Sequence, residues 1–376
     1  MLLLVFHVHG LAMLNTETLN QCQHVVPVRC FLAEFRPSTQ GITHTETDKR
    51  KSDKITSILD FHVFFTESGE KFIPRNWLLL SVVLFRRQFL TDGPMSQRSI
   101  IVVRHGERFD YTFNTDGSRW TSKVFDSEGK YTPCDLNMPK TVPKRKDDWK
   151  TANDTPLTVI GRTQATLTGN ALKEAGVSIT AVYCSPALRS VQTACGIVEG
   201  YGFSELISVE PGLHEWMQWT RYHRPTFMEP IELHENGYPI DTDYKPIIEL
   251  RELSSTETLE EFYDRGYSVV KQLLERHSSG AILLAAHGDM PDCCTRKLCG
   301  GEPRPFDDFF ALVKRTPFLG CVQAVEEQDG SWKIGPSPIP PLTHMDNGTY
   351  DSQQLCRPVP PMDDEMRNDI PPWMKK

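Results

Sequence analysis

The chain has 376 residues, of which 39% are hydrophobic and 24% are charged, and its formal net charge is −8. This composition is typical of a globular chain, and it excludes both a wholly disordered protein and a membrane-embedded bundle. The acidic balance disfavours nucleic acid and anionic lipid as partners, because their binding depends on arrays of Lys and Arg. We therefore expect no nucleic-acid partner and no membrane partner.

The ten cysteines show neither a C-x-x-C pair nor the spacing of a disulfide framework, which predicts reduced thiols and a cytoplasmic protein. Residues 1–14 are apolar, but they lack the basic start and the cleavage site of a signal peptide. The apolar run at 77–85 is far shorter than the ~18–20 residues that cross a bilayer. We predict no transmembrane segment.

Residues 1–95 form a poorly defined N-terminal region with no sustained periodicity. Within it, residues 68–77 contain a glycine, a proline and an Asn-aromatic pair, as in the closing strand of a Src-homology-three barrel. Residues 68–80 are therefore a candidate barrel remnant. A chance match is the favoured alternative, since no acidic loop or tryptophan pair precedes them.

Residues 96–346 have the pattern of one α/β domain. Short, continuous apolar runs alternate with helical patterns; the runs lie at 99–103, 181–184 and 281–286, and the helical patterns at 157–175, 188–199, 259–276 and 291–298. Such runs are typical of strands buried on both faces of a parallel sheet, and the intervening helices predict βαβ units. The expected fold is a three-layer α/β/α sandwich with a mostly parallel sheet. Residues 347–376 are proline-rich and predict a disordered tail.

Cationic and imidazole side chains follow all three apolar runs. The first run leads into Arg104-His105-Gly106-Glu107-Arg108, the second into a segment with Arg189, and the third into His287. Guanidinium groups match phosphate oxygens bidentately, and an imidazole between them can attack phosphorus. The carboxyl ends of parallel strands share one edge of a sheet. We therefore expect one tetrahedral anion to be surrounded by the three guanidinium groups and the two imidazoles, those of Arg104, Arg108, Arg189, His105 and His287.

The succession Arg-His-Gly, Ser-Pro-x-x-Arg and His-Gly over residues 100–344 resembles the histidine phosphatase superfamily, also called phosphoglycerate mutase-like. The resemblance implies that His105 is the nucleophile and becomes a phosphohistidine. It also implies that the phosphoryl group is held by Arg104, Arg108, Arg189 and His287. No cofactor and no metal is implied.

The same resemblance calls for a carboxylate that protonates the leaving oxygen. The preferred candidate is Glu215, in the segment Glu-Pro-Gly-Leu-His-Glu-Trp at 210–216. A carboxylate beside a phosphate can have its pKa raised enough to act as a proton donor. Glu107, inside the first motif, is the second candidate for the proton donor. The alternative interpretation of Glu107 is a structural role in positioning the loop.

Several segments are similar to the phosphatase domain of the ubiquitin-associated and Src-homology-three proteins, or suppressors of T-cell receptor signalling, and to ecdysteroid-phosphate phosphatases. They lie at 104–110, 129–137, 154–158, 185–194, 210–216, 241–244 and 342–344. The similarity implies a phosphatase for phosphotyrosine proteins or for small aryl or steroid phosphates. It also implies a homodimer, since these relatives pair through this domain. No ubiquitin-associated module is recognisable upstream, so ubiquitin and proline-motif binding are in doubt.

Two other functions stay open: a weakly active signalling adaptor that keeps the phosphate pocket, and a phosphoglycerate mutase-type phosphotransferase. The leaving-group pocket is expected to involve the insertion at 109–153 and a set of aromatic residues. These are Trp216, Trp219, Tyr222, Phe227 and Tyr238. Packing in the core is an equal alternative for several of them.

Overall fold

The chain divides into two compact units, Met1–Gly93 and Pro94–Lys376. The computed structural model describes residues 97–114, 117–340 and 350–375 with their side chains, and residues 24–29, 60–65 and 71–72 as backbone strands. These strands are β1 (His24–Arg29), β2 (Asp60–Phe65) and β3 (Lys71–Phe72), which form an antiparallel sheet in that order. The predicted barrel remnant at 68–80 lies outside the described residues except for β3.

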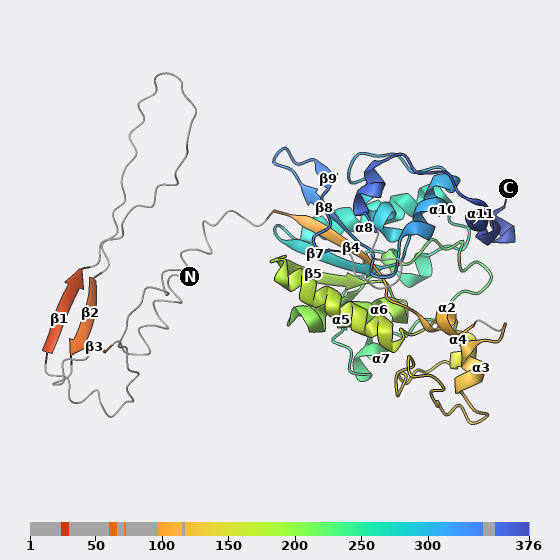
Figure 1. Cartoon of the computed structure of the whole chain (residues 1–376), viewed down its shortest axis with the longest axis horizontal. Coiled ribbons are helices and arrows are strands. Elements are labelled where there is room, and N and C mark those ends of the chain that lie inside the picture. Colours follow the sequence, from red (N-terminus) through yellow and green to blue (C-terminus); the bar gives the residue numbers. More distant parts are fainter. Residues whose placement is uncertain are drawn as a thin grey trace, which may run out of the picture. The chain divides into compact units, whose positions relative to one another are not determined.

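The second unit is built on a six-stranded sheet with the order β6-β5-β7-β4-β8-β9 (Figure 1). Its strands are β4 (Ser99–Arg104), β5 (Ile179–Cys184), β6 (Ser208–Val209), β7 (Ala281–Ala286), β8 (Cys321–Glu326) and β9 (Trp332–Ile334). The first four run parallel, whereas β8 is antiparallel to both of its neighbours. The predicted runs at 99–103, 181–184 and 281–286 are β4, β5 and β7, so the prediction of a mostly parallel sheet is confirmed.

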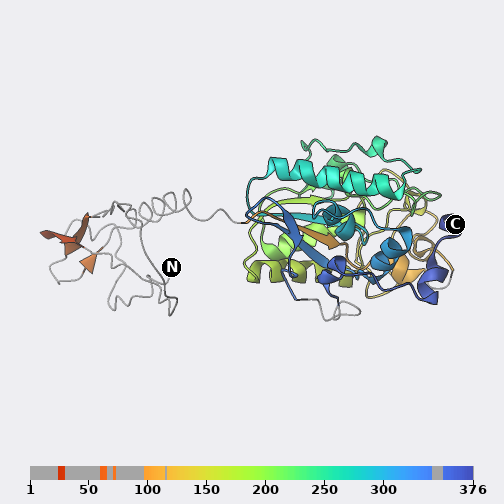
Figure 2. The same cartoon turned by 90° about the horizontal axis from the view of Figure 1, so that it is seen from above.

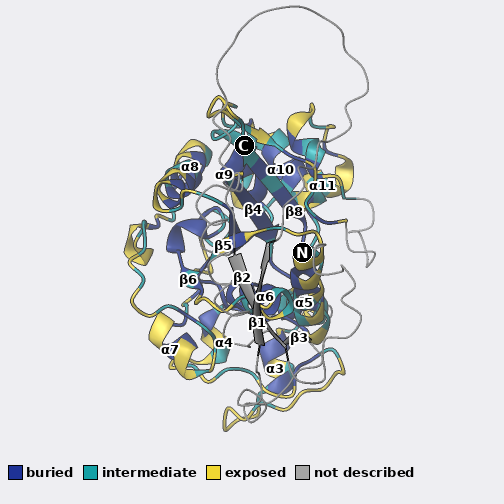
Figure 3. Ribbon diagram, turned by 90° about the vertical axis from the view of Figure 1, so that its left-hand side faces the viewer, coloured by how far each residue is buried: buried dark blue, intermediate teal, exposed yellow. Residues whose placement is uncertain are grey.

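The sheet is buried on both faces, which explains the continuous apolar runs of its central strands. All six residues of β7 are buried, as are the first five of β4 (Figure 3). Alternate side chains of β4 enter two different cores: Ile101 and Val103 lie in one, Ile100 and Val102 in the other. This alternation is the period-two geometry of a strand that separates two helical layers.

Helices cover each face and complete the three-layer sandwich (Figure 2). One layer contains α5 (Val159–Glu174) and α6 (Leu188–Tyr201). The other contains α8 (Leu259–Arg276), α9 (Met290–Arg296) and α10 (Phe306–Arg315). The three-layer prediction is confirmed, because the residues of the two cores divide between these two sets of helices.

Helices α5 and α6 pack so closely that glycine is required between them. A Cβ added to Gly169 would lie 2.1 Å from the backbone oxygen of Ile197, and one added to Gly200 would lie 2.0 Å from that of Thr166. Both distances are below any real carbon–oxygen contact. The close packing holds the last turns of α6 against α5, and the first turn of the same helix carries Arg189.

Short helices occupy the connections between these elements. They are α2 (Phe109–Phe113), α3 (Trp120–Val124), α4 (Trp149–Ala152) and α7 (Pro230–Glu235). The first three lie in the insertion at 109–153, which has its own small core of Phe109, Trp120, Val124 and Met138. Within the part of the chain that the structure describes, no helix combines the length and apolarity needed to cross a membrane.

The structure differs from the predicted disordered tail. Residues 350–375 contain the 3-10 helix η6 (Ser352–Cys356), helix α11 (Asp364–Asp369) and the 3-10 helix η7 (Pro372–Met374). Leu355 and Met362 are 5% and 7% exposed, and they pack against the α10 layer. The proline-rich composition predicts disorder because it shows no periodic apolar pattern. A few apolar side chains, here Leu355 and Met362, nevertheless suffice to hold an extended segment on an existing core. Residues 347–349 lie outside the described residues.

Candidate active site

Three neighbouring strands deliver the predicted residues to one edge of the sheet. Strand β4 ends at Arg104 and is followed by His105, while β7 is followed by His287. Strand β5 leads through Ser185 into α6, whose second residue is Arg189. The imidazole rings of His105 and His287 lie 5.6 Å apart between centroids, at an interplanar angle of 74°. The structure therefore brings together side chains that are up to 183 residues apart in the sequence (104 to 287).

The loop that carries His105 is held by its backbone. The N–H of His105 donates to the oxygen of Ala286 at 2.9 Å, and the N–H of Gly106 donates to Oγ1 of Thr193 at 3.0 Å. A Cβ on Gly106 would lie 2.7 Å from the backbone oxygen of Gly161 in α5. Glycine is needed at 106 because the loop and the helix touch there. The imidazole is thus fixed from several sides.

His105 is 2% exposed, and its Nδ1 lies 2.9 Å from the backbone oxygen of Gly106. Because a carbonyl oxygen can only accept, the neutral ring carries its proton on Nδ1 and keeps the lone pair of Nε2 free. Burial lowers the pKa of His105 well below its usual value, and the charges of Arg189 and Arg104 add to this effect. The imidazole is therefore neutral and nucleophilic at Nε2.

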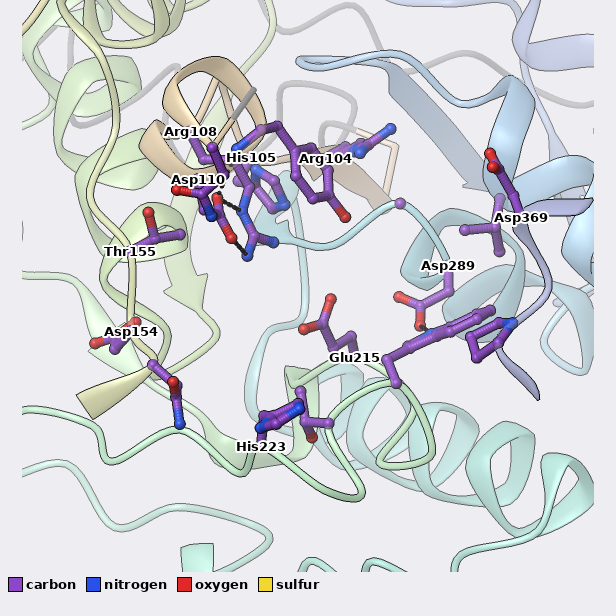
Figure 4. A pocket seen from close by; sticks show the side chains of 18 of the residues that line it. Arg104, His105, Arg108, Asp110, Asp154, Thr155, Glu215, His223, Asp289 and Asp369 are labelled. Atoms are coloured by element: carbon purple, nitrogen blue, oxygen red, sulfur yellow. Dashed lines mark hydrogen bonds and ion pairs between the residues drawn. The ribbon is translucent and has the colours of Figure 1, made fainter. Parts of the chain in front are cut away.

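Arg189 connects the second imidazole to a carboxylate (Figure 4 shows Glu215). Its Nη2 lies 3.1 Å from Nδ1 of His287 and donates to Oε1 of Glu215 at 2.8 Å. Nε2 of His287 lies 2.7 Å from Oγ of Ser185. Nδ1 of His287 also lies 3.4 Å from Oε2 of Glu215. Burial lowers the pKa of His287 to about 4, so the neutral form prevails.

Glu215 is a carboxylate in the free site. Burial opposes its ionisation, but Arg189 and His287 outweigh burial and hold the pKa of Glu215 well below its usual value. Its side chain is 16% exposed and lines the same pocket as His105. It follows η3 (Pro211–Leu213), the turn after β6. The edge strand β6 therefore brings this acidic group to the cations.

Arg104 and Arg108 form the other side of the cluster. Arg104 donates from Nη1 to the backbone oxygen of Thr316, and its guanidinium lies 4.6 Å from the ring centre of Phe318. Arg108 makes a two-point contact with Asp110, at 2.6 Å from Nε and 2.5 Å from Nη2. Both arginines line the pocket. An anion that enters meets guanidinium groups already oriented by protein partners, which is the arrangement that stabilises phosphoryl groups best.

The rival carboxylate, Glu107, is placed differently. It is 7% exposed, and its Oε1 accepts from Nδ2 of Asn137 at 2.8 Å and from Oγ1 of Thr158 at 2.7 Å. Thr158 caps α5, and Glu107 also accepts the backbone N–H of Thr158 through its own backbone oxygen. Glu107 therefore ties the His105 loop to α5, which corresponds to the structural alternative.

A pocket of about 680 Å³ opens from this cluster. Its volume lies within the range of sites that hold small organic molecules. Aromatic side chains make up much of its lining: Tyr111, Trp120, Trp149, Trp219, Phe310 and Trp373. The first three come from the insertion at 109–153, as predicted.

The other predicted aromatics divide between the pocket and the core, except Tyr222, which is 60% exposed and lines neither. Trp219 lines the pocket, whereas Trp216 is 7% exposed and lies in the core beneath it. Phe227 packs on the ring of His214 at 5.0 Å, and Tyr238 accepts a hydrogen bond from Gln192. The core alternative holds for these residues.

The sequence interpretation missed Asp289, although it is the second residue after His287. Asp289 is 2% exposed and lines the pocket, where its Oδ2 accepts from the N–H of Trp216 at 2.8 Å and from Nε1 of Trp219 at 2.9 Å. Burial raises the pKa of Asp289 to about 6, and the negative charge of Glu215 adds to this. Asp289 holds the loop that carries Glu215.

A third imidazole, His214, lies beneath the site. It is fully buried, its ring lies 5.1 Å from that of His287, and neither ring nitrogen has a hydrogen-bond partner among the described residues. Burial lowers the pKa of His214 well below its usual value, and the neighbouring His287 adds to this effect. As pH falls below the unfolded-state pKa near 6.5, the unfolded chain binds this proton first, so stability is lost.

We expect the replacement His214→Phe to remove this acid sensitivity. Between pH 7 and pH 5, the free energy of unfolding of the unchanged protein should fall by up to about 2 kcal/mol more than that of the variant. Urea denaturation at both pH values measures the difference. His234→Phe on the exposed face of α7 is the control, and equal losses in the unchanged protein and in His214→Phe would contradict the prediction.

No group of three or more His, Cys, Asp or Glu side chains that could hold a metal ion occurs in residues 97–114, 117–340 and 350–375. The cationic cluster instead suits an anion. The guanidinium groups of this cluster are hydrogen-bond donors, and their contacts with the protein fix their positions. The arrangement can therefore bind a phosphoryl group, present an imidazole to it and place a carboxylate beside the leaving oxygen.

Comparison with known proteins identifies the group to which this site belongs. Residues 140–334 match the model of the histidine phosphatase superfamily (branch 1). The chain is 41% identical over 265 residues to the ecdysteroid-phosphate phosphatase of Drosophila melanogaster, covering 69% of this chain and 34% of that protein. It is 38% identical over 266 residues to the human ubiquitin-associated and SH3 domain-containing protein A, covering 69% of this chain and 40% of that protein.

The crystal structure of the ecdysone phosphate phosphatase of Bombyx mori, in complex with tungstate, has the same fold. It superposes with a TM-score of 0.58 at 30% identity, covering 69% of this chain and 100% of that one. The chain belongs to the histidine phosphatase superfamily, branch 1.

Proposed function

We propose that this protein is a phosphomonoesterase that works through a phosphohistidine at His105. One observation carries the proposal: three guanidinium groups and two imidazoles meet at one edge of the sheet, where Arg104, His105 and Arg108 line a pocket of about 680 Å³. Phosphoryl transfer depends on fixed positive charge around the equatorial oxygens and on an aligned nucleophile. The neighbouring cations supply the charge, and the neutral imidazole supplies the nucleophile.

In the first step, Nε2 of His105 attacks phosphorus while the bond from phosphorus to the leaving oxygen breaks. Glu215 gives its proton to that oxygen, and the alcohol or phenol departs. In the second step, Glu215 takes a proton from water as the water oxygen attacks the phosphohistidine. Inorganic phosphate is released, and His105 returns to its neutral form.

The low pKa of Glu215 in the free site is consistent with this role. A bound phosphate dianion places negative charge beside the carboxylate and competes for Arg189 and His287, which now hold the carboxylate. Both changes favour the protonated carboxyl and raise its pKa. Substrate binding would therefore prepare Glu215 to act as an acid.

We propose aryl or steroid phosphates, or protein phosphotyrosine, as the substrate class. The aromatic lining beyond the cations favours a flat, apolar leaving group, because such groups bury large areas against aromatic side chains. The ecdysteroid-phosphate phosphatases among the relatives support a steroid phosphate. The chain spans 34% of the first of these relatives, so its activity and substrates are our proposal.

The test is a substrate panel assayed on the full chain with a chelator present. A phosphotyrosine peptide, a steroid phosphate and 3-phosphoglycerate are compared for release of inorganic phosphate. Quenching of the reaction with labelled substrate in alkaline denaturant should trap phosphate on histidine, because phosphohistidine is labile in acid and stable in alkali. Formation of 2-phosphoglycerate without free phosphate would instead indicate a mutase, and binding without turnover would indicate an adaptor.

We further propose a cytoplasmic protein that forms a homodimer. All eight cysteines in the described residues are free thiols, which supports a reducing compartment. The dimer follows from the resemblance to relatives that pair through this domain. Light scattering coupled to size-exclusion chromatography measures it directly.

A further inference from the structure

The C-terminal segment, residues 361–375, is anchored on the outer helical layer. Met362 is 7% exposed and clusters with Phe310 of α10, and Met366 and Ile370 pack against the same cluster. The segment contains α11 and η7. It therefore has a defined position beside the pocket, with its apolar anchors on the side that faces α10.

The end of this segment lines the pocket that contains His105. Asp369, Pro371 and Trp373 are among its lining residues. Nζ of Lys314, in the last turn of α10, lies 2.5 Å from Oδ2 of Asp369. Figure 4 shows Asp369 across the pocket from Asp110. The segment is thus a wall of the outer part of the pocket.

Trp373 is the aromatic residue of this wall. Its Nε1 donates to the backbone oxygen of Gln218 at 3.2 Å, and its ring lies 5.1 Å from that of Tyr222 at an angle of 80°. The indole is 38% exposed, so much of its surface is available to a ligand. Trp219, next to Gln218, lines the same pocket. Two loops far apart in sequence therefore present indoles to one space.

Resting on the proposed phosphatase function, we propose that this segment is a specificity element and that Trp373 selects phosphoesters with extended apolar leaving groups. The cations bind only the phosphoryl group, so the remainder of a substrate must extend outward between the aromatic walls. A single phenyl ring leaves most of a pocket of about 680 Å³ empty, whereas a fused-ring system reaches its outer part. Burial of such rings against an indole favours the larger substrate.

The experiment compares phenyl phosphate with estrone 3-phosphate, which contains the same phenyl phosphate unit extended by further fused rings. The two leaving groups are phenols of similar acidity, so the chemical step is matched. In the full chain, Trp373→Ala should lower the ratio of kcat/KM for estrone 3-phosphate to kcat/KM for phenyl phosphate by about tenfold. The loss should appear as a higher KM for estrone 3-phosphate.

Trp373→Phe separates the wall from the hydrogen bond to Gln218. Phenylalanine keeps an aromatic surface and loses the donor, so it should retain most of the ratio if the ring itself is what the substrate contacts. Trp332→Ala on β9 is the matched control, because Trp332 is a partly buried indole outside the pocket lining. Thermal unfolding of each variant verifies that the fold is kept.

Equal losses for both substrates in Trp373→Ala would overturn the inference, as would a ratio that does not change or that rises. A fall of the ratio in Trp373→Phe as large as that in Trp373→Ala would also overturn it. These outcomes differ from a failure of the proposed function, in which the unchanged protein would hydrolyse neither substrate. Active protein with an unchanged ratio in the variant leaves the phosphatase intact and removes only the role of Trp373.

Discussion

His105→Ala is expected to lower kcat for phenyl phosphate by at least about 10³-fold, since removal of a covalent nucleophile eliminates the two-step path. The acid-labile phosphoenzyme should disappear at the same time. The reason is the geometry of the site. The neutral imidazole of His105 is fixed among guanidinium groups, and its Nε2 carries a free lone pair. Stopped-time phosphate release and alkaline quenching measure the two effects.

A matched histidine distinguishes this effect from general damage. His277 follows α8, where its Nε2 lies 2.8 Å from the hydroxyl of Tyr183 outside the pocket. His277→Ala should keep the phosphoenzyme and turn over within a few-fold of the unchanged protein. Retained turnover in His105→Ala would assign the nucleophile elsewhere and remove the proposed mechanism.

Arg189→Ala is expected to lower kcat/KM by about 10²–10³-fold, because removal of one preformed donor to a developing oxyanion costs about 2.7–4 kcal/mol. Arg189 is 2% exposed and contacts both His287 and Glu215, so it links the phosphate site to the acid. The affinity for tungstate, used as a tetrahedral oxyanion probe, should fall as well. Arg189→Lys restores the charge without the two-point fork and should recover only part of the loss.

Arg189→Ala should raise two pKa values in the free protein. Loss of the positive charge raises the pKa of Glu215 and the pKa of His105, because Arg189 lowers both. The carboxylate and the imidazole thus both become easier to protonate, and the imidazole becomes less available as a nucleophile at low pH. NMR titration of the His105 ring follows this shift. Arg98→Ala, outside the pocket, is the control, and an equal loss of kcat/KM there would contradict the assignment.

Sequence reasoning could locate the cluster of arginines and histidines because the necessary information is local. An unbroken apolar run such as 281–286 indicates a strand buried on both faces, and the residue that follows it must lie at the edge of the sheet. His105, Arg189 and His287 each follow such a run, so their convergence was predictable from parallel strands alone. Glu215 was found only through the family resemblance, since β6 is two residues long and carries no recognisable pattern.

The amino-acid sequence by itself determined the mostly parallel sheet and which cations and imidazoles meet at its edge, because strand burial and strand polarity fix both. Only the tertiary structure decided the outer pocket. Trp373 and Gln218 are separated by 155 residues, and their contact depends on the packing of Met362 and Ile370 against α10. Burial of a few apolar side chains between distant segments leaves no periodic trace in a proline-rich chain, so packing alone places this wall.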